Sequence, residues 1–322
     1  MENYKHSLLN WYQHNKRDLP FRNTKDPYAI YISEIMAQQT RIDQMLPYYE
    51  RWMNKWPTIT SLANASEEEV ISMWHGLGYY NRARKILQTS KIIQQDYHGL
   101  FPEDYETLLS LPGIGPYTAG AIGSIAFNLQ TPAIDGNVNR IITRYYALDK
   151  EVTTLQKEIY SLVYEVMGTE NTSEFTQGLM ECGALICTPT HPDCLNCPLN
   201  NQCLAYKQGN QEHYPVKKKK TPPKELEYYV YLIIHENKLV LTDNSKDGLL
   251  KGFLRLPMEE INLYKGKYLF DSKHVFSHRI WNMHVYLLED CYLEDYTYYP
   301  IDQLEQLPIA VAHQKILTRF LP

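Results

Sequence analysis

The chain has 322 residues, of which 44% are hydrophobic and 21% are charged, and its formal net charge is −5. These values are ordinary for a globular protein, and the length predicts two domains, because single hydrophobic cores stop growing at about 250–300 residues. No apolar run is long enough to span a bilayer, and residues 1–6 (MENYKH) do not open a secretory signal, so we expect a cytosolic protein and no membrane contact.

The negative net charge argues against a nucleic-acid partner, but the charge is unevenly distributed. Residues 1–150 hold 15 Lys and Arg against 15 Asp and Glu, whereas residues 221–322 hold 11 against 14. A basic face on the first part of the chain therefore stays compatible with the composition.

The first 210 residues alternate amphipathic segments with short turns, which predicts a bundle of helices and not a sheet. The expected helices span 28–39, 43–55, 66–74, 80–97, 103–110, 116–127, 137–147, 151–167 and 171–186.

Glu34 lies in the first of these helices. Ile30, Tyr31 and Ala37 stand three or four residues away and share its face. A carboxyl group among such neighbours should have a raised pKa, which is the property that a general acid needs. The alternative is a salt-bridged glutamate at the surface.

Two turns carry side chains that suit nucleic acid. Residues 74–82 (WHGLGYYNR) place Tyr79 after two glycines at an expected helix start, where a projecting tyrosine can wedge between bases. Residues 36–41 (MAQQTR) end the Glu34 helix with Gln38 and Gln39, whose amides suit base edges. Core packing of the tyrosine and solvation of the glutamines are the alternatives.

Residues 111–120 (LPGIGPYTAG) predict a helix, a tight glycine turn and a second helix. Gly113 and Gly115 supply backbone conformations that a side chain would forbid, and the following helix N-terminus offers free amides to a phosphate. A helix-pair connection without a ligand is the alternative. Asp135, which follows an apolar run and precedes Gly136, is the acid that favours a functional site here.

Four of the six cysteines follow the spacing C-x6-C-x2-C-x5-C, at Cys187, Cys194, Cys197 and Cys203. Disulfides are not expected in a cytosolic chain of this size, so a metal centre held by thiolates is the leading interpretation. Structural zinc and a [4Fe-4S] cluster both satisfy this spacing.

The character of the chain changes after residue 210. Residues 217–226 (KKKKTPPKEL) predict a basic linker stiffened by prolines, and the lysines suit contact with phosphate. Strands are expected at 227–234, 239–241, 273–276 and 282–288, and a closing helix at 311–320. The fold class is thus a mainly α first domain followed by an α+β second domain.

The hairpin at 111–119, Asp135 and the four-cysteine loop together resemble the helix-hairpin-helix DNA glycosylases related to endonuclease III. Within that superfamily, residues 33–40 (SEIMAQQT), 76–80 (GLGYY) and 135–138 (DGNV) resemble the adenine DNA glycosylases of the MutY family. The resemblance covers nearly the whole chain. It implies a glycosylase domain over 1–216, with a six-helix module at about 28–135 and an iron-sulfur module at 1–27 and 136–216.

The resemblance implies that the metal is a [4Fe-4S] cluster and that the substrate is duplex DNA. The enzyme would remove adenine mispaired with 8-oxoguanine or, less well, with guanine, as a base-excision-repair glycosylase. The protein is expected to be a monomer in the cytoplasm of a bacterial-type cell, associated with the nucleoid. A replication clamp or other repair proteins are candidate partners.

The resemblance also assigns catalytic roles. Glu34 would protonate the flipped adenine, and an ionised Asp135 would stabilise or capture the sugar cation that remains. Tyr117 and Asn137 would position Asp135 and the sugar or phosphate. Bifunctional relatives have a lysine at the position of Tyr117, so base removal without efficient strand cleavage is expected.

DNA contacts are implied at further positions, and two pocket residues depart from the family pattern. Phe21 stands where tryptophan is common and Ala37 where leucine is, so the pocket should stay apolar but be smaller. The implied contact residues are Gly113 and Gly115 at a phosphate, Gln39 and Tyr79 in the stack around 8-oxoguanine, and Arg22 and Gln177 at the DNA backbone or the adenine pocket.

Residues 248–257 (GLLKGFLRLP) resemble the start of the MutT-like (Nudix-related) domain that adenine glycosylases carry, which implies such a domain over 227–322. The catalytic Nudix acid box is not visible, so recognition without pyrophosphatase activity is expected. Phe276, Ser277 and His278 match the loop by which the family senses 8-oxoguanine. A plain turn between two strands is the alternative at that loop.

Overall fold

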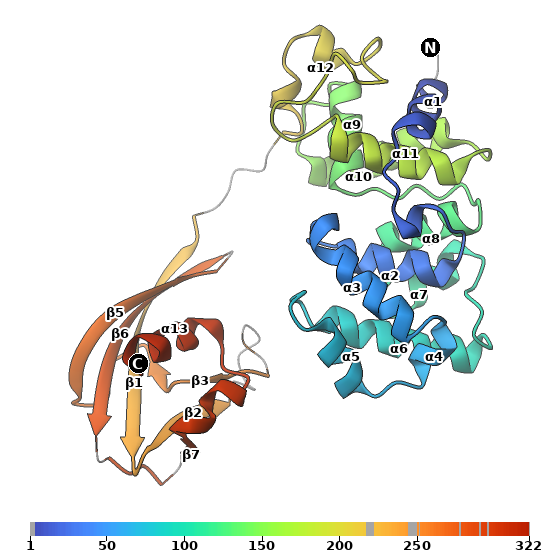
Figure 1. Ribbon diagram of the computed structural model, residues 1–322. Helices are drawn as coiled ribbons and strands as arrows, with labels where there is room; N and C mark the ends of the chain where they lie inside the picture. The colour runs from blue at the N-terminus through green and yellow to red at the C-terminus, as the bar shows by residue number, and fades with distance from the viewer. Residues whose placement is uncertain are drawn as a thin grey trace. The chain divides into compact units, whose positions relative to one another are not determined.

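The computed structural model describes residues 4–216, 222–243, 250, 252–276, 278–289, 291–294 and 296–321. The chain forms two compact units, Met1–Lys218 and Lys219–Pro322, of which the first is helical and the second is built on a sheet (Figure 1). Among the described residues, no helix combines the length and the apolar character needed to cross a membrane.

The first unit contains all the helices expected from the sequence, with ends shifted by at most two residues. Three helices were not expected: α1, which buries only two residues, and α4 and α12, which are too short to show a period. The elements are α1 (Lys5–Asn15), η1 (Pro20–Arg22), α2 (Pro27–Ala37), α3 (Ile42–Lys55), α4 (Ile59–Ala63), α5 (Glu67–Trp74), α6 (Asn81–Asp96), α7 (Tyr105–Ser110), α8 (Pro116–Ala126), α9 (Gly136–Tyr145), α10 (Val152–Met167), α11 (Thr172–Leu185), α12 (Leu204–Lys207) and η2 (Gln211–His213).

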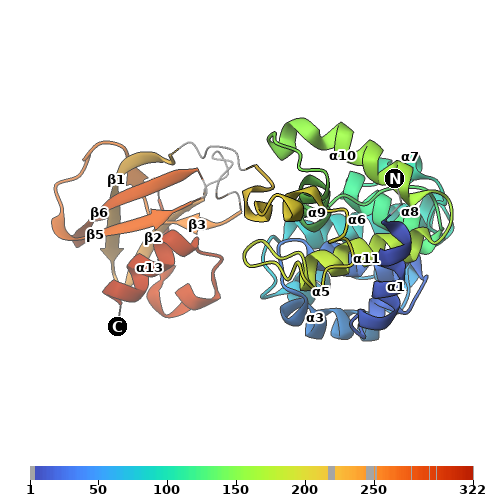
Figure 2. The same cartoon turned by 90° about the horizontal axis from the view of Figure 1, so that it is seen from above.

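Two hydrophobic cores support this unit. The larger core is formed by α2 to α8 around the buried rings of Trp52 and Trp74. The smaller core joins α1 to α9, α10 and α11, with Leu8 and Phe175 completely buried. Helix α1 lies beside α11 in both views, so the start of the chain packs against a helix more than 150 residues later (Figures 1 and 2).

Helix α2 passes through the larger core and positions the site. Asp26 caps its N-terminus by accepting a hydrogen bond from the backbone N–H of Tyr28 at 3.0 Å, and Pro27 occupies the first turn. Every residue from 28 to 36 is buried, including Glu34. Helix α8 packs against α2, and its apolar residues bring Tyr117, at the start of α8, towards the same interior.

The second unit is a mixed sheet with the strand order β3-β2-β1-β6-β5, in which β4 and β7 pair with β1 and β2. The central strands β1 and β6 are parallel, and helix α13 packs over β5. One core lies between the sheet and α13, and a smaller aromatic core covers the other face. The elements are β1 (Lys224–His235), β2 (Lys238–Asp243), β3 (Leu254–Arg255), β4 (Met258–Glu259), β5 (Lys267–Val275), β6 (Arg279–Glu289), β7 (Thr297–Pro300), η3 (Ile301–Gln306) and α13 (Val311–Phe320).

The expected strands of this unit are present, but β5 begins six residues earlier than the sequence pattern predicts. A register shift between Tyr268 and Phe270 breaks the alternation of buried and exposed side chains there. The short strands β3, β4 and β7 were not expected, because two to four residues carry no readable period.

Candidate active site

A cavity of about 620 Å³ opens in the first unit, where the end of α2, the start of α8 and the start of α9 converge. It brings together side chains that lie more than a hundred residues apart in the sequence. Of the predicted site residues, the cavity is lined by Arg22, Glu34, Gln39, Tyr117, Asp135 and Asn137. Phe21 and Ala37, the two departures from the family pattern, also line it.

Glu34 lies at the buried side of this cavity, with 7% of its surface exposed. The hydroxyl of Tyr117 donates a hydrogen bond to Glu34 Oε2. Burial raises the pKa of Glu34, and the charge of Asp135 raises it further, whereas the Tyr117 hydroxyl and the charge of Arg22 lower it. The net effect is a raised pKa, so Glu34 keeps its proton to higher pH than an exposed glutamate does.

Asp135 is the N-cap of α9. Its carboxylate accepts hydrogen bonds from the backbone N–H of Val138 at 2.7 Å and from Asn137 Nδ2 at 2.8 Å. Burial raises the pKa of Asp135 too, but these donors and the charge of Arg140 oppose the shift. The net pKa shift of Asp135 is also upward, because burial is the largest contribution. Asp135 nevertheless accepts more hydrogen bonds than Glu34 does, and these partly offset the effect of burial.

Tyr117 and Asn137 each form a hydrogen bond with a different one of the two acids. The family resemblance implies that both residues position Asp135. In the structure Asn137 hydrogen-bonds Asp135, whereas the Tyr117 hydroxyl donates to Glu34. A hydrogen bond across 83 residues of sequence could not be read from local spacing.

Arg22 is held at the cavity wall by a buried ion pair that the sequence analysis did not find. Glu181 is completely buried and accepts from Arg22 Nη2 at 3.4 Å and from Arg17 Nε at 2.6 Å. Burial opposes the charge of Glu181, but the Arg17 hydrogen bonds and the Arg22 charge outweigh it, so the pKa of Glu181 is lowered. Arg22 also donates to Gln177 Oε1 at 3.4 Å. Gln177 is buried and is not among the described residues that line the cavity, so its contact with the site is through Arg22.

The two turns that carry Gln39 and Tyr79 lie at the edge of the site. Both residues have left-handed backbones, with φ of 59° for Gln39 and 51° for Tyr79. Gln39 lines the cavity, but Tyr79 is not among the described residues that do. The Tyr79 side chain is 66% exposed, so it is available to a partner outside the cavity.

In the glycine turn before α8, only one of the two glycines has the backbone conformation expected from the sequence. Gly113 needs to be glycine, because its φ is +81° and a Cβ there would lie 2.8 Å from Lys85 Cβ. For Gly115 the predicted conformational requirement is wrong: its backbone is extended, with φ of −95°, and any residue could adopt it. Apart from Gly115 itself and its two neighbours in the chain, no described residue has an atom within 4 Å of a Cβ placed at Gly115, so a ligand can approach the N-terminus of α8 there.

The four predicted metal-binding cysteines line one cavity of about 20 Å³ beyond α11. All of them are free thiols. Arg144 donates to Cys187 Sγ at 3.3 Å and also to the carbonyl oxygens of Thr188 and Pro189. Within the described ranges, no set of three or more His, Cys, Asp or Glu side chains has metal-binding geometry.

Helix α9 connects this loop to the acid at its N-cap. Arg140 is buried and donates to Asn137 Oδ1 at 2.7 Å and to the carbonyl oxygen of Cys187 at 2.6 Å. Asn137 in turn donates to Asp135. A continuous set of hydrogen bonds therefore runs from Asp135 to the cysteine loop.

The predicted sensing loop lies between β5 and β6. Phe276 packs against Trp281, with ring centroids 4.7 Å apart, and its backbone N–H donates to the carbonyl oxygen of Arg279. The carbonyl oxygen of His278 accepts from the backbone N–H of Lys224 at 3.1 Å. Ser277 lies outside the described residues, as do the linker lysines 217–220 and part of the 248–257 motif.

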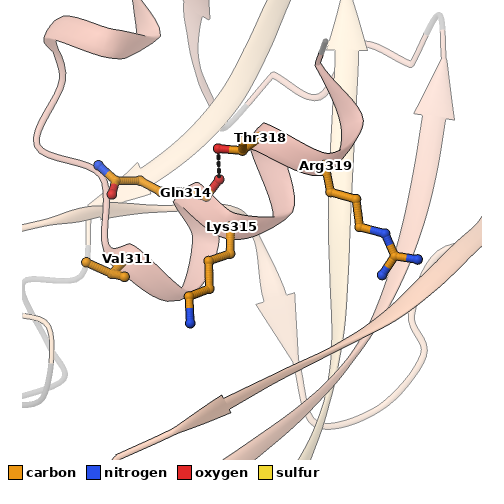
Figure 3. A pocket seen from close by; sticks show the side chains of 5 residues that line it. All are labelled: Val311, Gln314, Lys315, Thr318 and Arg319. Carbon is orange, nitrogen blue, oxygen red and sulfur yellow. Dashed lines mark hydrogen bonds between the residues drawn. The ribbon is translucent and has the colours of Figure 1, made fainter.

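A second hollow, of about 390 Å³, lies along the outer face of α13 (Figure 3). It is lined by Val311, Gln314, Lys315, Thr318 and Arg319, and the Thr318 hydroxyl donates to the carbonyl oxygen of Gln314 at 3.0 Å. These side chains all come from one face of a single helix and include no carboxylate. The cavity around Glu34 is therefore the candidate active site.

Comparison with known proteins agrees with this geometry. Residues 32–163 match the HhH-GPD superfamily base excision DNA repair protein model. The chain is 34% identical to the adenine DNA glycosylase of Buchnera aphidicola subsp. Acyrthosiphon pisum (strain APS), over 97% of this chain and 96% of that relative. The chain belongs to the adenine DNA glycosylase family. It is thus a DNA glycosylase of base excision repair.

This adenine DNA glycosylase family member is also similar to a human protein and to two solved structures. The human adenine DNA glycosylase is 40% identical over 65% of this chain and 40% of its own length. A thermostable thymine-DNA glycosylase structure has a TM-score of 0.59 and 27% identity, covering 64% of this chain and 95% of its own. An endonuclease III–DNA complex, with a TM-score of 0.54 and 23% identity over 64% of this chain and 94% of its own, shares the fold.

The buried carboxyl group of Glu34 should make stability depend on pH. In the folded protein the pKa of Glu34 is raised above the ordinary value of 4.5, which applies to the unfolded chain. At a pH between these two values, the folded protein holds the Glu34 proton and the unfolded chain has released it. The contribution that protonated Glu34 makes to the free energy of unfolding at low pH is therefore lost as the pH rises through the pKa of Glu34 in the folded protein. Glu34→Gln should raise Tm at pH 8, by about 2–4 °C for each kcal/mol recovered, and change it little at pH 4.

The matched control is Glu158→Gln, a change at an exposed glutamate in the middle of α10 that should shift Tm little at either pH. Thermal unfolding followed by circular dichroism measures both variants. A Tm difference for Glu34→Gln that is equal at pH 4 and pH 8 would contradict the raised pKa.

Proposed function

We propose that this glycosylase removes adenine mispaired with 8-oxoguanine, or less efficiently with guanine, from duplex DNA. The observation that carries the proposal is the pair of acids in one cavity, both with pKa values raised by burial, of which Asp135 also accepts hydrogen bonds from Asn137 and from the backbone of Val138. A base in a duplex is inaccessible to such a cavity, so the adenine has to be flipped out of the stack.

In the proposed mechanism, protonated Glu34 is the general acid. Its proton passes to a ring nitrogen of adenine, and the electron pair of the breaking N-glycosidic bond goes to the base, which leaves neutral. Glu34 is then a carboxylate and can accept a proton from the incoming water. The Tyr117 hydroxyl orients the Glu34 carboxyl group during both steps.

Asp135 is proposed to act on the sugar. Loss of the base leaves an oxocarbenium-like deoxyribose, and an ionised carboxylate beside it stabilises the positive charge or forms a bond to it. Asn137 fixes one oxygen of Asp135 and the backbone N–H of Val138 fixes the other. Water then adds to the anomeric carbon, and the products are free adenine and an abasic site.

Tyr117 supports a monofunctional enzyme. A glycosylase that also cuts the strand needs an amine to form a Schiff base with the sugar. A tyrosine has no amine, and here its hydroxyl is committed to Glu34. We therefore expect base removal with little strand cleavage.

The second unit is proposed to be the MutT-like domain that recognises 8-oxoguanine. Support comes from its mixed sheet with a packed helix and from the loop at 276–278, where Phe276 is anchored on Trp281. Ser277 and His278 have side chains that can donate and accept hydrogen bonds at the oxidised base edge. No pyrophosphatase activity is proposed for this unit.

The cysteine loop is proposed to hold a [4Fe-4S] cluster. The donor set fits such a group, since four free thiols line one cavity and the positive charge of Arg144 lies beside Cys187. Cys187, Cys194, Cys197 and Cys203 would be the ligands. A bound cluster would tie the loop together and thereby support α9, which carries Asp135 at its start.

Duplex DNA is the proposed partner, with the protein acting as a monomer in the cytoplasm of a bacterial-type cell. Gly113 and the open N-terminus of α8 at Gly115 suit a phosphate of the substrate strand. A replication clamp and other repair proteins remain candidate partners.

The proposal predicts a specific pattern of excision. Under single-turnover conditions, adenine should leave fastest opposite 8-oxoguanine, more slowly opposite guanine, and barely opposite cytosine or thymine. Glu34→Gln should lower the rate opposite 8-oxoguanine by about 10²- to 10⁴-fold, the range typical of a lost general acid, while DNA binding persists. Near-normal excision by Glu34→Gln, or equal rates opposite all four bases, would refute the proposal.

The proposed cluster predicts a yellow-brown protein that contains iron and acid-labile sulfide in equal amounts. Cys194→Ser should lose most of this iron, because Cys194 lines the cysteine cavity. Cys291→Ser is the control, since Cys291 belongs to the aromatic core of the second unit and should leave the iron content unchanged. A colourless protein with stoichiometric zinc would show that the metal is structural zinc instead.

A further inference from the structure

Arg82, in the first turn of α6, joins two turns that the sequence keeps about forty residues apart. Its guanidinium donates hydrogen bonds to backbone carbonyl oxygens in both of them. The acceptors at the end of α2 are Ile35 at 2.8 Å, Met36 at 3.4 Å and Gln38 at 2.6 Å, and those in the loop before α6 are Leu77 at 3.2 Å and Gly78 at 3.3 Å.

The end of α2 depends on these hydrogen bonds. The last carbonyl groups of a helix have no partner within the helix and need donors from elsewhere. In the fully described helix α2, no basic residue stands in the last turn, and the chain continues through Gln38 without a glycine. Arg82 supplies the missing donors from another helix. A lysine could not do so equally, because its ammonium group lacks the planar fork of an arginine.

The loop before α6 is held by the same side chain. The carbonyl oxygen of Gly78 accepts from Trp74 Nε1 at 2.9 Å as well as from Arg82. The guanidinium also lies 5.3 Å from the centroid of the Trp74 ring and 5.4 Å from that of the Tyr79 ring. Trp74 is completely buried, so Tyr79 is tied through Arg82 to the core of the unit.

Each turn ends in a residue with a strained backbone. Gln39 and Tyr79 both have left-handed φ values, a conformation that costs non-glycine residues energy and persists only where surrounding contacts hold it. Gln39 directly follows the Arg82 acceptor Gln38, and Tyr79 directly follows the acceptor Gly78. One guanidinium therefore fixes the backbone next to both residues.

We propose that Arg82 is a positioning residue that holds Gln39 and Tyr79 as one rigid pair, so that both enter the DNA stack together when adenine is flipped out. This inference rests on the proposed function, because it concerns the DNA that the enzyme acts on. Arg82 is not among the described residues that line the cavity. Because Ile35 directly follows Glu34, Arg82 also supports the helix that carries the acid, but we expect its effect on the opening of the stack to exceed its effect on the breaking of the glycosidic bond.

The first experiment measures unstacking directly. A duplex with adenine opposite 8-oxoguanine carries 2-aminopurine beside the mispair, and Glu34→Gln protein keeps the substrate intact. A saturating concentration of the Glu34→Gln protein should raise the 2-aminopurine fluorescence. A second substitution in that protein, Arg82→Lys or Arg82→Met, should reduce the rise at least about threefold. Fluorescence anisotropy confirms that each double variant still binds the DNA. The control is Arg84→Met, at an exposed arginine of the same helix that pairs with Glu67.

The second experiment separates positioning from a general loss of structure. Single-turnover excision by the Arg82 variants, with Glu34 intact, is compared on a paired A:8-oxoguanine duplex and on adenine within an unpaired bubble, where the stack is already open. We expect a fall of about tenfold on the paired substrate and less than about threefold in the bubble. Equal losses on both substrates, or an undiminished fluorescence rise, would overturn the inference.

These outcomes are distinct from failure of the proposed function. If the unmodified enzyme excises adenine from neither substrate, the proposed function fails, and the fluorescence experiment still reports whether Arg82 controls insertion. If excision is normal but the Arg82 variants match Arg84→Met in both experiments, only the positioning role fails.

Discussion

The burial of one carboxyl group, that of Glu34, is the constraint on which the rest of the site depends. Helix α2 runs through the core with every residue from 28 to 36 buried, so an acid in its middle loses water and its pKa rises. The Tyr117 hydroxyl and the Arg22 charge limit that rise. The interior thus keeps a protonatable acid beside the cavity, at some cost in stability.

Helix α9 gives the second acid, Asp135, whose pKa burial also raises, more hydrogen-bond donors than Glu34 has. Asp135 caps the helix, and the donors of that cap are the groups that favour its charged form. Further along the same helix, Arg140 and Arg144 hold the cysteine loop through carbonyl oxygens and the sulfur of Cys187. Hydrogen bonds through Arg140 and Asn137 therefore connect the cysteine loop to Asp135. If the loop holds the proposed cluster, the order that the cluster gives the loop would reach Asp135 by this route.

Local patterns predicted the elements and some environments, but not the pairings between distant segments. The long helices follow from their apolar periodicity, and the buried setting of Glu34 follows from Ile30, Tyr31 and Ala37 on one helix face. The Tyr117–Glu34 hydrogen bond joins residues 83 positions apart, and the Glu181 ion pairs join residues at least 159 positions apart. The contacts of Arg82 with the end of α2 span 44 to 47 positions. No spacing rule encodes such contacts, since they arise only when the helices pack.

The pH dependence of single-turnover adenine excision tests the central role of Glu34 most directly. With Glu34 as general acid, the rate should fall as the pH rises through its raised pKa. Tyr117→Phe removes a hydrogen bond that lowers this pKa, so the fall should move to higher pH in that variant. A fall at the same pH in both proteins would contradict the role of Glu34 as the acid that makes adenine leave.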